Sequence, residues 1–173
     1  MFDRGTTRFT LRGAAAPLYD WAVSRSRDPT LYAIMGAPDT VEGRFELLTL
    51  HIILLVDRLA RAGPDAAESR QALFDLYISN LDGAMREMGV GDLAMGKRMK
   101  ALGQAFYGRA EAYEEAFSVW PNTDALRQLI ARTILPHGDA GPLSAYVTER
   151  RDELAGYDDH ALLGGLIAQA SRA

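Results

Sequence analysis

Apolar residues recur at intervals of three and four through most of the chain, the spacing that places them on one face of an α-helix. The longest such stripe consists of Met95, Met99, Leu102, Phe106, Ala110, Tyr113 and Phe117. The sequence contains no sustained alternation of apolar and polar residues, which would mark half-buried strands. The pattern therefore predicts an all-α protein.

Capping and helix-breaking residues divide this pattern into about seven helices. Pro and Gly fall between the segments, as in Asp28-Pro29, Gly63-Pro64 and the loop 136–142. The predicted helices span residues 15–27, 41–62, 64–88, 92–119, 124–135, 143–155 and 160–170, with a short turn at 31–35. No repeat, low-complexity tract or long linker interrupts them. We therefore expect a single compact domain over residues 1–173, in which residues 1–14 form a flexible end.

The composition of the chain excludes several classes of function. The absence of cysteine excludes disulfides, thiol catalysis and Cys-based metal sites, and it agrees with a reducing, cytoplasmic compartment. A net charge of −4 argues against specific nucleic-acid binding. The most apolar stretch, residues 47–56, is about half as long as a membrane span, so it predicts a buried core helix instead.

A helix end followed by a helix start is predicted between residues 88 and 92. Gly89 suits the left-handed residue just past a helix end. Asp92, which follows Gly91, suits the N-cap of the next helix. Gly96 and Gly103 lie one heptad apart beside the apolar stripe, where the missing side chains would let a neighbouring helix approach closely.

Lys97 and Lys100 are the only lysines of the chain, beside 17 arginines. With Arg98 they lie off the apolar stripe at the start of a predicted helix, where positive charge opposes the helix dipole. We expect an exposed basic ridge with a binding role; the alternative is that two exposed lysines survived by chance. Residues 91–97 match most of a phosphate-loop pattern, but the missing hydroxyl at Arg98 and the preceding predicted helix argue against nucleotide binding.

No set of residues in the sequence predicts catalysis or metal binding. His51 lies in an apolar helix without a second ligand on its face, so it is interpreted as a core histidine. His137 lies in a loop, and the run 158–160, which ends in His160, offers too few ligands for a strong metal site. We therefore predict no metal, no cofactor and no enzymatic activity.

Two stretches of the sequence together resemble the ubiquinol–cytochrome c chaperone family. The first is Gly36-Ala37-Pro38-Asp39-Thr40-Val41-Glu42-Gly43-Arg44-Phe45-Glu46-Leu47, followed by Leu50-His51. The second is Met88-Gly89-Val90-Gly91-Asp92-Leu93-Ala94-Met95-Gly96-Lys97-Arg98-Met99-Lys100, followed by Phe106-Tyr107-Gly108-Arg109. The resemblance extends from about residue 32 to residue 117 and weakens toward the C-terminus.

The resemblance implies an all-helical assembly factor for the cytochrome bc1 complex, respiratory complex III, that receives newly made cytochrome b. Mitochondrial members of the family work with a small partner protein near the ribosome. This chain resembles the short bacterial form, which lacks the long N-terminal extension, and its partner subunit and ribosome contact are therefore left open. The expected location is cytoplasmic, with the inner-membrane surface as a further contact.

We interpret the second motif as the client-binding region. The client-binding residues predicted there are Met95, Lys97, Arg98, Met99, Lys100, Tyr107 and Arg109. The residues predicted to have structural roles are Asp39, Thr40, Arg44, Phe45, Gly89, Gly91, Asp92 and Gly96. Two simpler readings stay open: Met95 and Met99 belong to the core, and Tyr107 packs within its own chain.

Two other classes of function stay open beside the chaperone. A helical enzyme that handles haem or quinone would need a buried histidine or acid cluster in a pocket, such as a cavity around His51. A general protein-binding adaptor would bind unrelated apolar peptides.

Overall fold

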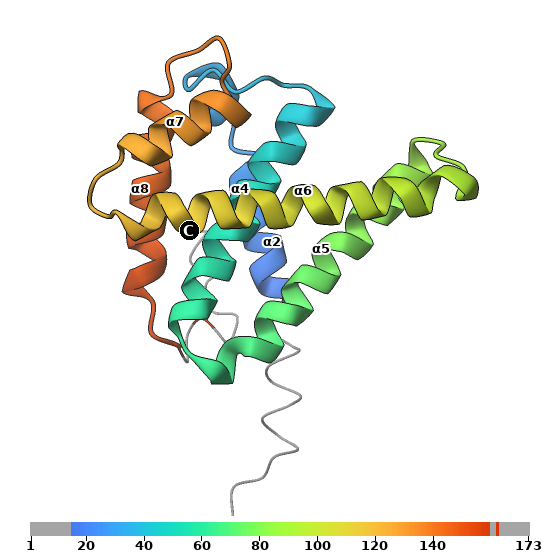
Figure 1. The fold of residues 1–173 in the computed structure, drawn as a ribbon, viewed down its shortest axis with the longest axis horizontal. Helices are drawn as coiled ribbons and strands as arrows, with labels where there is room; N and C mark the ends of the chain where they lie inside the picture. The colour runs from blue at the N-terminus through green and yellow to red at the C-terminus, as the bar shows by residue number, and fades with distance from the viewer. Residues whose placement is uncertain (1–14, 160–161, 163–173) are drawn as a thin grey trace, which may run out of the picture.

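The computed structural model describes residues 15–159 and 162, and helices form most of this part of the chain (Figure 1). In chain order they are α2 (Ala15–Ser26), α3 (Pro29–Ala33), α4 (Val41–Arg61), the 3-10 turn η1 (Pro64–Ala66), α5 (Ala67–Glu87), α6 (Asp92–Ser118), α7 (Asp124–Thr133) and α8 (Gly141–Gly156). Residues 15–159 contain no β-strand, so the all-α prediction is confirmed. The predicted helix 160–170 and the predicted flexible end 1–14 lie outside the described residues.

Helix α4 forms the centre of the domain, because α2, α5, α6 and α8 all contact it. Its apolar residues, among them Leu47, Leu50 and Leu54, are completely or almost completely buried. The prediction of a core helix over residues 47–56 is therefore confirmed. In the described part of the chain, no helix combines the length and hydropathy that crossing a bilayer would require.

The start of α4 is fixed by a cap and a close backbone contact. Thr40 has an extended backbone, and its hydroxyl oxygen accepts a hydrogen bond from the Gly43 amide at 3.1 Å. Thr40 is thus the N-cap, whereas Asp39 binds the Arg44 guanidinium at 2.6 Å. A Cβ atom at Gly43 would lie 2.0 Å from the carbonyl oxygen of Pro38, so only glycine fits at this position.

Helices α5 and α6 form a hairpin that projects from one side of the domain (Figure 1). Gly89 ends α5 with a φ of 83°, as predicted, and the Val90 amide donates to the Met85 carbonyl oxygen at 3.1 Å. The prediction that Asp92 caps α6 is wrong: Gly91 is the N-cap residue and no side chain caps it. The Asp92 carboxylate instead accepts a hydrogen bond from Arg86 of α5 at 2.7 Å, because it lies within reach across the turn.

The apolar stripe of α6 packs onto the rest of the domain as predicted. Met95, Phe106 and Tyr113 are buried. The packing role predicted for Gly96 and Gly103 is wrong, since a Cβ atom at either position would meet nothing within 4 Å. Their spacing placed them beside the stripe, but no helix of the described chain lies against them.

Helix α8 is attached to the core by two arginines. Arg151 lies over the rings of Phe117 and Trp120, 4.5 and 4.6 Å from their centroids, and donates to Asp57 of α4. Arg58 of α4 is 7% exposed and donates to the carbonyl oxygen of Leu154. These contacts hold the C-terminal part of the described chain against α4.

Candidate binding groove

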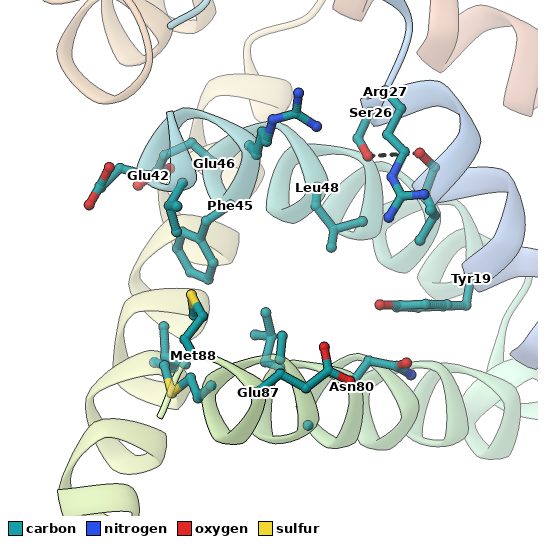
Figure 2. Close-up of a pocket in the computed structure, with 18 of the residues that line it drawn as sticks. Tyr19, Ser26, Arg27, Glu42, Phe45, Glu46, Leu48, Asn80, Glu87 and Met88 are labelled. Carbon is teal, nitrogen blue, oxygen red and sulfur yellow. Dashed lines mark hydrogen bonds between the residues drawn. The ribbon is translucent and has the colours of Figure 1, made fainter. Parts of the chain in front are cut away.

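A groove of about 720 Å³ lies between α2, the N-terminal half of α4 and the C-terminal half of α5, and residues of the short helix α3 and of α6 also line it. Its apolar lining residues are Tyr19, Val23, Tyr32, Val41, Phe45, Leu48, Leu81, Ala84, Met85, Met88 and Leu102. Figure 2 shows Phe45 and Leu48 projecting from α4 toward the opposite wall, where Met88 lies. Tyr19 closes one end of this view from α2. The groove is therefore an apolar slot open at one side of the domain.

Charged side chains of both signs surround the apolar lining. Glu42, Glu87 and Arg27 lie in the lining without an ion pair among the described residues. Arg44 is paired with Asp39 and remains more than half exposed. A segment with an apolar face and a few polar flanking residues would therefore find complementary surface here.

Two polar contacts, one buried and one partly buried, join the helices around the groove. The Thr49 hydroxyl donates to the Phe45 carbonyl oxygen at 2.7 Å and lies 2.7 Å from the Tyr77 hydroxyl, which joins α4 to α5. Because Thr49 has only one proton to donate, Tyr77 donates to it. Burial raises the pKa of Tyr77 far above its usual value, so this hydroxyl keeps its proton.

The second contact joins α4 to α6. Arg109 donates to both carboxylate oxygens of Glu46, at 2.8 and 3.0 Å, and Glu46 itself lines the groove. The hydrogen bonds to Glu46 are the main cause that raises the pKa of Arg109, and they keep its guanidinium charged. The position of α6 relative to the groove is thus fixed by a charged, bidentate pair.

The tyrosines of the groove remain neutral at physiological pH. Burial raises the pKa of both Tyr19 and Tyr32 above the ordinary value for a phenol. The Tyr32 hydroxyl donates to the Ser26 carbonyl oxygen at 2.7 Å, which holds its ring at the end of α2. Both rings therefore present apolar faces and uncharged hydroxyls to the groove.

The seven residues predicted to bind a client lie outside this groove as the structure describes it. Lys97, Arg98 and Lys100 are exposed, Met95 is buried and Met99 is half-buried. Among the described residues, no ion pair involves the three cations. The basic ridge is thus exposed as expected, whereas Met95 belongs to the core.

Tyr107 and Arg109 differ from each other in their surroundings. Tyr107 is 63% exposed, but its ring packs 5.4 Å from Phe74 and 5.9 Å from Phe106, centroid to centroid. The Tyr107 side chain therefore packs against its own chain and still leaves most of its surface open to solvent. The Arg109 guanidinium is bound to Glu46 and its side chain remains one-third exposed, so a client contact at Arg109 stays a prediction.

Two residues predicted to be structural, Arg44 and Phe45, do line the groove, together with Met85 and Met88. Sequence reasoning missed the groove because its walls come from segments far apart in the chain. One signal pointed to it: four methionines cluster around the α5–α6 turn, and two of them, Met85 and Met88, lie in its wall.

His51 lies in the core and not in a pocket. It is fully buried, its Nδ1 lies 2.7 Å from the Leu47 carbonyl oxygen, and its Nε2 lies 2.8 Å from the Tyr146 hydroxyl. A carbonyl oxygen only accepts, so Nδ1 carries the proton and Tyr146 donates to Nε2. Burial lowers the pKa of His51 from 6.5 to about 4, which keeps the ring neutral.

No group of three or more acidic or histidine side chains within residues 15–159 is placed to hold a metal ion. Of the run 158–160, His160 lies outside the described residues, and the Asp159 carboxylate accepts from Arg58 at 2.7 Å. The groove itself contains no histidine among its lining residues. The geometry therefore suits binding of an apolar segment rather than coordination chemistry.

Comparisons with known proteins agree with this geometry. Residues 33–168 match the family model described as ubiquinol-cytochrome C chaperone. The fold is similar to that of the Cbp3 homolog from Brucella abortus, with 34% sequence identity and a TM-score of 0.80, over 91% of this chain and 88% of that chain. No curated protein gives a significant match. The chain therefore belongs to the ubiquinol–cytochrome c chaperone family, the assembly chaperones of the cytochrome bc1 complex.

Proposed function

We propose that this chaperone binds newly made cytochrome b and holds an apolar segment of it in the groove between α2, α4 and α5. It acts by binding and release, without catalysis. The groove carries the proposal: it is an open apolar slot on a protein whose family assembles a membrane complex. Cytochrome b enters as the client through the family resemblance.

The chemistry of the groove suits a membrane-protein segment. Phe45, Tyr19 and Tyr32 provide rigid apolar surface, and Met85 and Met88 provide side chains that adapt to different shapes. An apolar helix side chain that leaves water for this groove gains about 1.5–3 kcal/mol. A few such side chains are enough to hold a segment until it is handed on.

A second candidate function is the handling of haem or quinone, because about 720 Å³ is also a normal volume for a cofactor site. The groove offers no histidine to ligate haem iron, and His51 is enclosed between Trp21 and Tyr146 in the core. These observations favour the protein client.

Photo-crosslinking inside cells tests the proposal. A benzophenone amino acid replaces Phe45 in the groove or, as a comparison, Tyr107 outside it, in cells that are assembling the bc1 complex. We expect cytochrome b to be captured from position 45 and not from position 107. Capture from position 107 alone would mean that the client binds outside the groove, on the face of α6 that carries Tyr107. Capture of many unrelated apolar proteins from position 45 would indicate a general adaptor.

A further inference from the structure

The tip of the α5–α6 hairpin, residues 88–100, exposes apolar side chains that nothing in the described chain covers. Leu93 is fully exposed and Met88 is 60% exposed. Monomeric proteins expose single apolar residues routinely, but these two flank the turn that joins α5 to α6 in a projecting hairpin (Figure 1). The tip therefore exposes two apolar side chains, Leu93 and Met88, to its surroundings.

Three basic residues follow Leu93 within the next two turns of α6. Lys97, Arg98 and Lys100 are exposed, and no ion pair among the described residues involves them. Asp92 is the acidic residue within residues 88–100 and is paired with Arg86, whereas Glu87 lies directly before Met88. On a chain with a net charge of −4, this is a local cluster of free cations.

Helix geometry places the apolar and cationic groups on one face. Leu93, Lys97 and Lys100 are separated by four and three residues, so they lie above one another on α6. Arg98 lies on an adjacent face of the same turn. An exposed apolar residue followed by cations on one helix face is the arrangement of segments that lie on anionic membrane surfaces.

We propose that the hairpin tip docks on an anionic membrane surface, with Leu93 entering the headgroup region and the three cations contacting lipid phosphates. Nucleic acid would attract the cations but would gain nothing from an exposed leucine and methionine. Met88 also lines the groove, so docking would bring one end of the groove to the bilayer. Vesicle binding needs no client, so this inference stands or fails separately from the proposed function.

Co-sedimentation of the full chain with vesicles tests this inference. We expect binding to vesicles of phosphatidylcholine and phosphatidylglycerol, and little binding to phosphatidylcholine alone. Each cation near such a surface should contribute about fivefold, so replacing Lys97, Arg98 and Lys100 by Gln should weaken binding on the order of 100-fold. Leu93→Ser should weaken it about tenfold, and this loss should persist at high salt.

Matched controls remove the same groups elsewhere on the surface. Replacing Arg61, Arg127 and Arg132 by Gln changes the net charge equally, and Val119→Ser removes an apolar residue that is 50% exposed. Both controls should bind vesicles like the unchanged chain. Because the chain has no cysteine, Leu93→Cys also takes a single polarity-sensitive dye, whose emission should shift to shorter wavelength on anionic vesicles.

Four results would overturn the inference. The first three are no binding to anionic vesicles at low salt, equal losses in the control and tip variants, and a dye at position 93 that stays in water while the protein is bound. Loss of binding to a single-stranded RNA by the Lys97, Arg98 and Lys100 variant, with vesicle binding unchanged, would identify the cluster as a nucleic-acid contact and would also overturn it.

Discussion

Arg109 of α6 and Glu46 of α4 form a bidentate ion pair, with the Arg109 Nε and Nη2 atoms 3.0 and 2.8 Å from the two carboxylate oxygens. The two residues are 63 positions apart in the chain. One belongs to the first family motif and the other to the second. The resemblance therefore rests partly on residues that meet in the structure and fix α6 beside the groove.

The first prediction concerns this pair. Both side chains are partly buried, with 33% and 16% of their surface exposed, so the pair should stabilise the fold by more than a surface salt bridge. In a double-mutant cycle of Arg109→Ala and Glu46→Ala, we expect a coupling free energy of unfolding of about 1–2 kcal/mol. The exposed pair of Arg44 and Asp39 is the control and should give a clearly smaller coupling free energy, because solvent screens it. Additive effects at positions 46 and 109 would contradict this prediction.

The second prediction concerns pH and His51. The folded protein holds His51 neutral down to a pKa of about 4, whereas the unfolded chain binds a proton near 6.5. Between these values the unfolded state holds more protons, so the free energy of unfolding should fall as the pH is lowered from 6.5 to 4. The loss attributable to this group is about 3 kcal/mol at most.

Urea denaturation at a series of pH values measures this loss. The His51→Gln variant should be less stable at neutral pH but should lose much of the slope between pH 6.5 and 4. His137 is exposed in a loop, so His137→Gln serves as the matched control and should keep the slope. An unchanged slope in His51→Gln would show that other groups cause the pH dependence.

The third prediction compares two glycines. A Cβ atom at Gly43 would overlap the Pro38 carbonyl oxygen, so Gly43→Ala should destabilise the protein by about 2 kcal/mol or more. Gly96 lies in an exposed helix interior with open space around it, so Gly96→Ala should stabilise the protein by about 0.5–1 kcal/mol. Thermal unfolding of the two variants measures both effects. If Gly96→Ala is destabilising, the site has a packing partner that the described chain does not show.

The sequence predicted the helices and their ends well, because these depend on local chemistry. The conformation of Gly89 follows from the residues beside it, and the buried stripe of α6 follows from its periodicity. The start of α4 follows less directly from the sequence, which offers two adjacent residues of capping type, Asp39 and Thr40. The backbone decides between them: Thr40 has the extended conformation of an N-cap, and Asp39 binds Arg44 instead.

The groove was beyond sequence reasoning for a physical reason. Periodicity separates a buried face from an exposed one, but it does not say which helices enclose a space. Tyr19, Phe45 and Met88 line one groove only because α2, α4 and α5 pack together. For the same reason the sequence does not show that Arg109 pairs with Glu46, because the two residues lie on different helices, 63 positions apart.

The last prediction tests the groove with a matched pair of substitutions. Met88 and Val119 are the C-cap residues of α5 and α6 and are 60% and 50% exposed, but only Met88 lines the groove. A glutamate at either position meets the same unfavourable helix-dipole end, so both variants should unfold at similar temperatures. If an apolar segment of the client covers Met88, Met88→Glu buries a charge without a partner, which costs several kcal/mol. We therefore expect Met88→Glu to lower the amount of assembled bc1 complex and of cytochrome b at least tenfold, while Val119→Glu leaves both near normal. Native gels of membranes from cells that carry each variant as the sole copy measure this difference. Equal assembly in the two strains would place the client elsewhere on the protein.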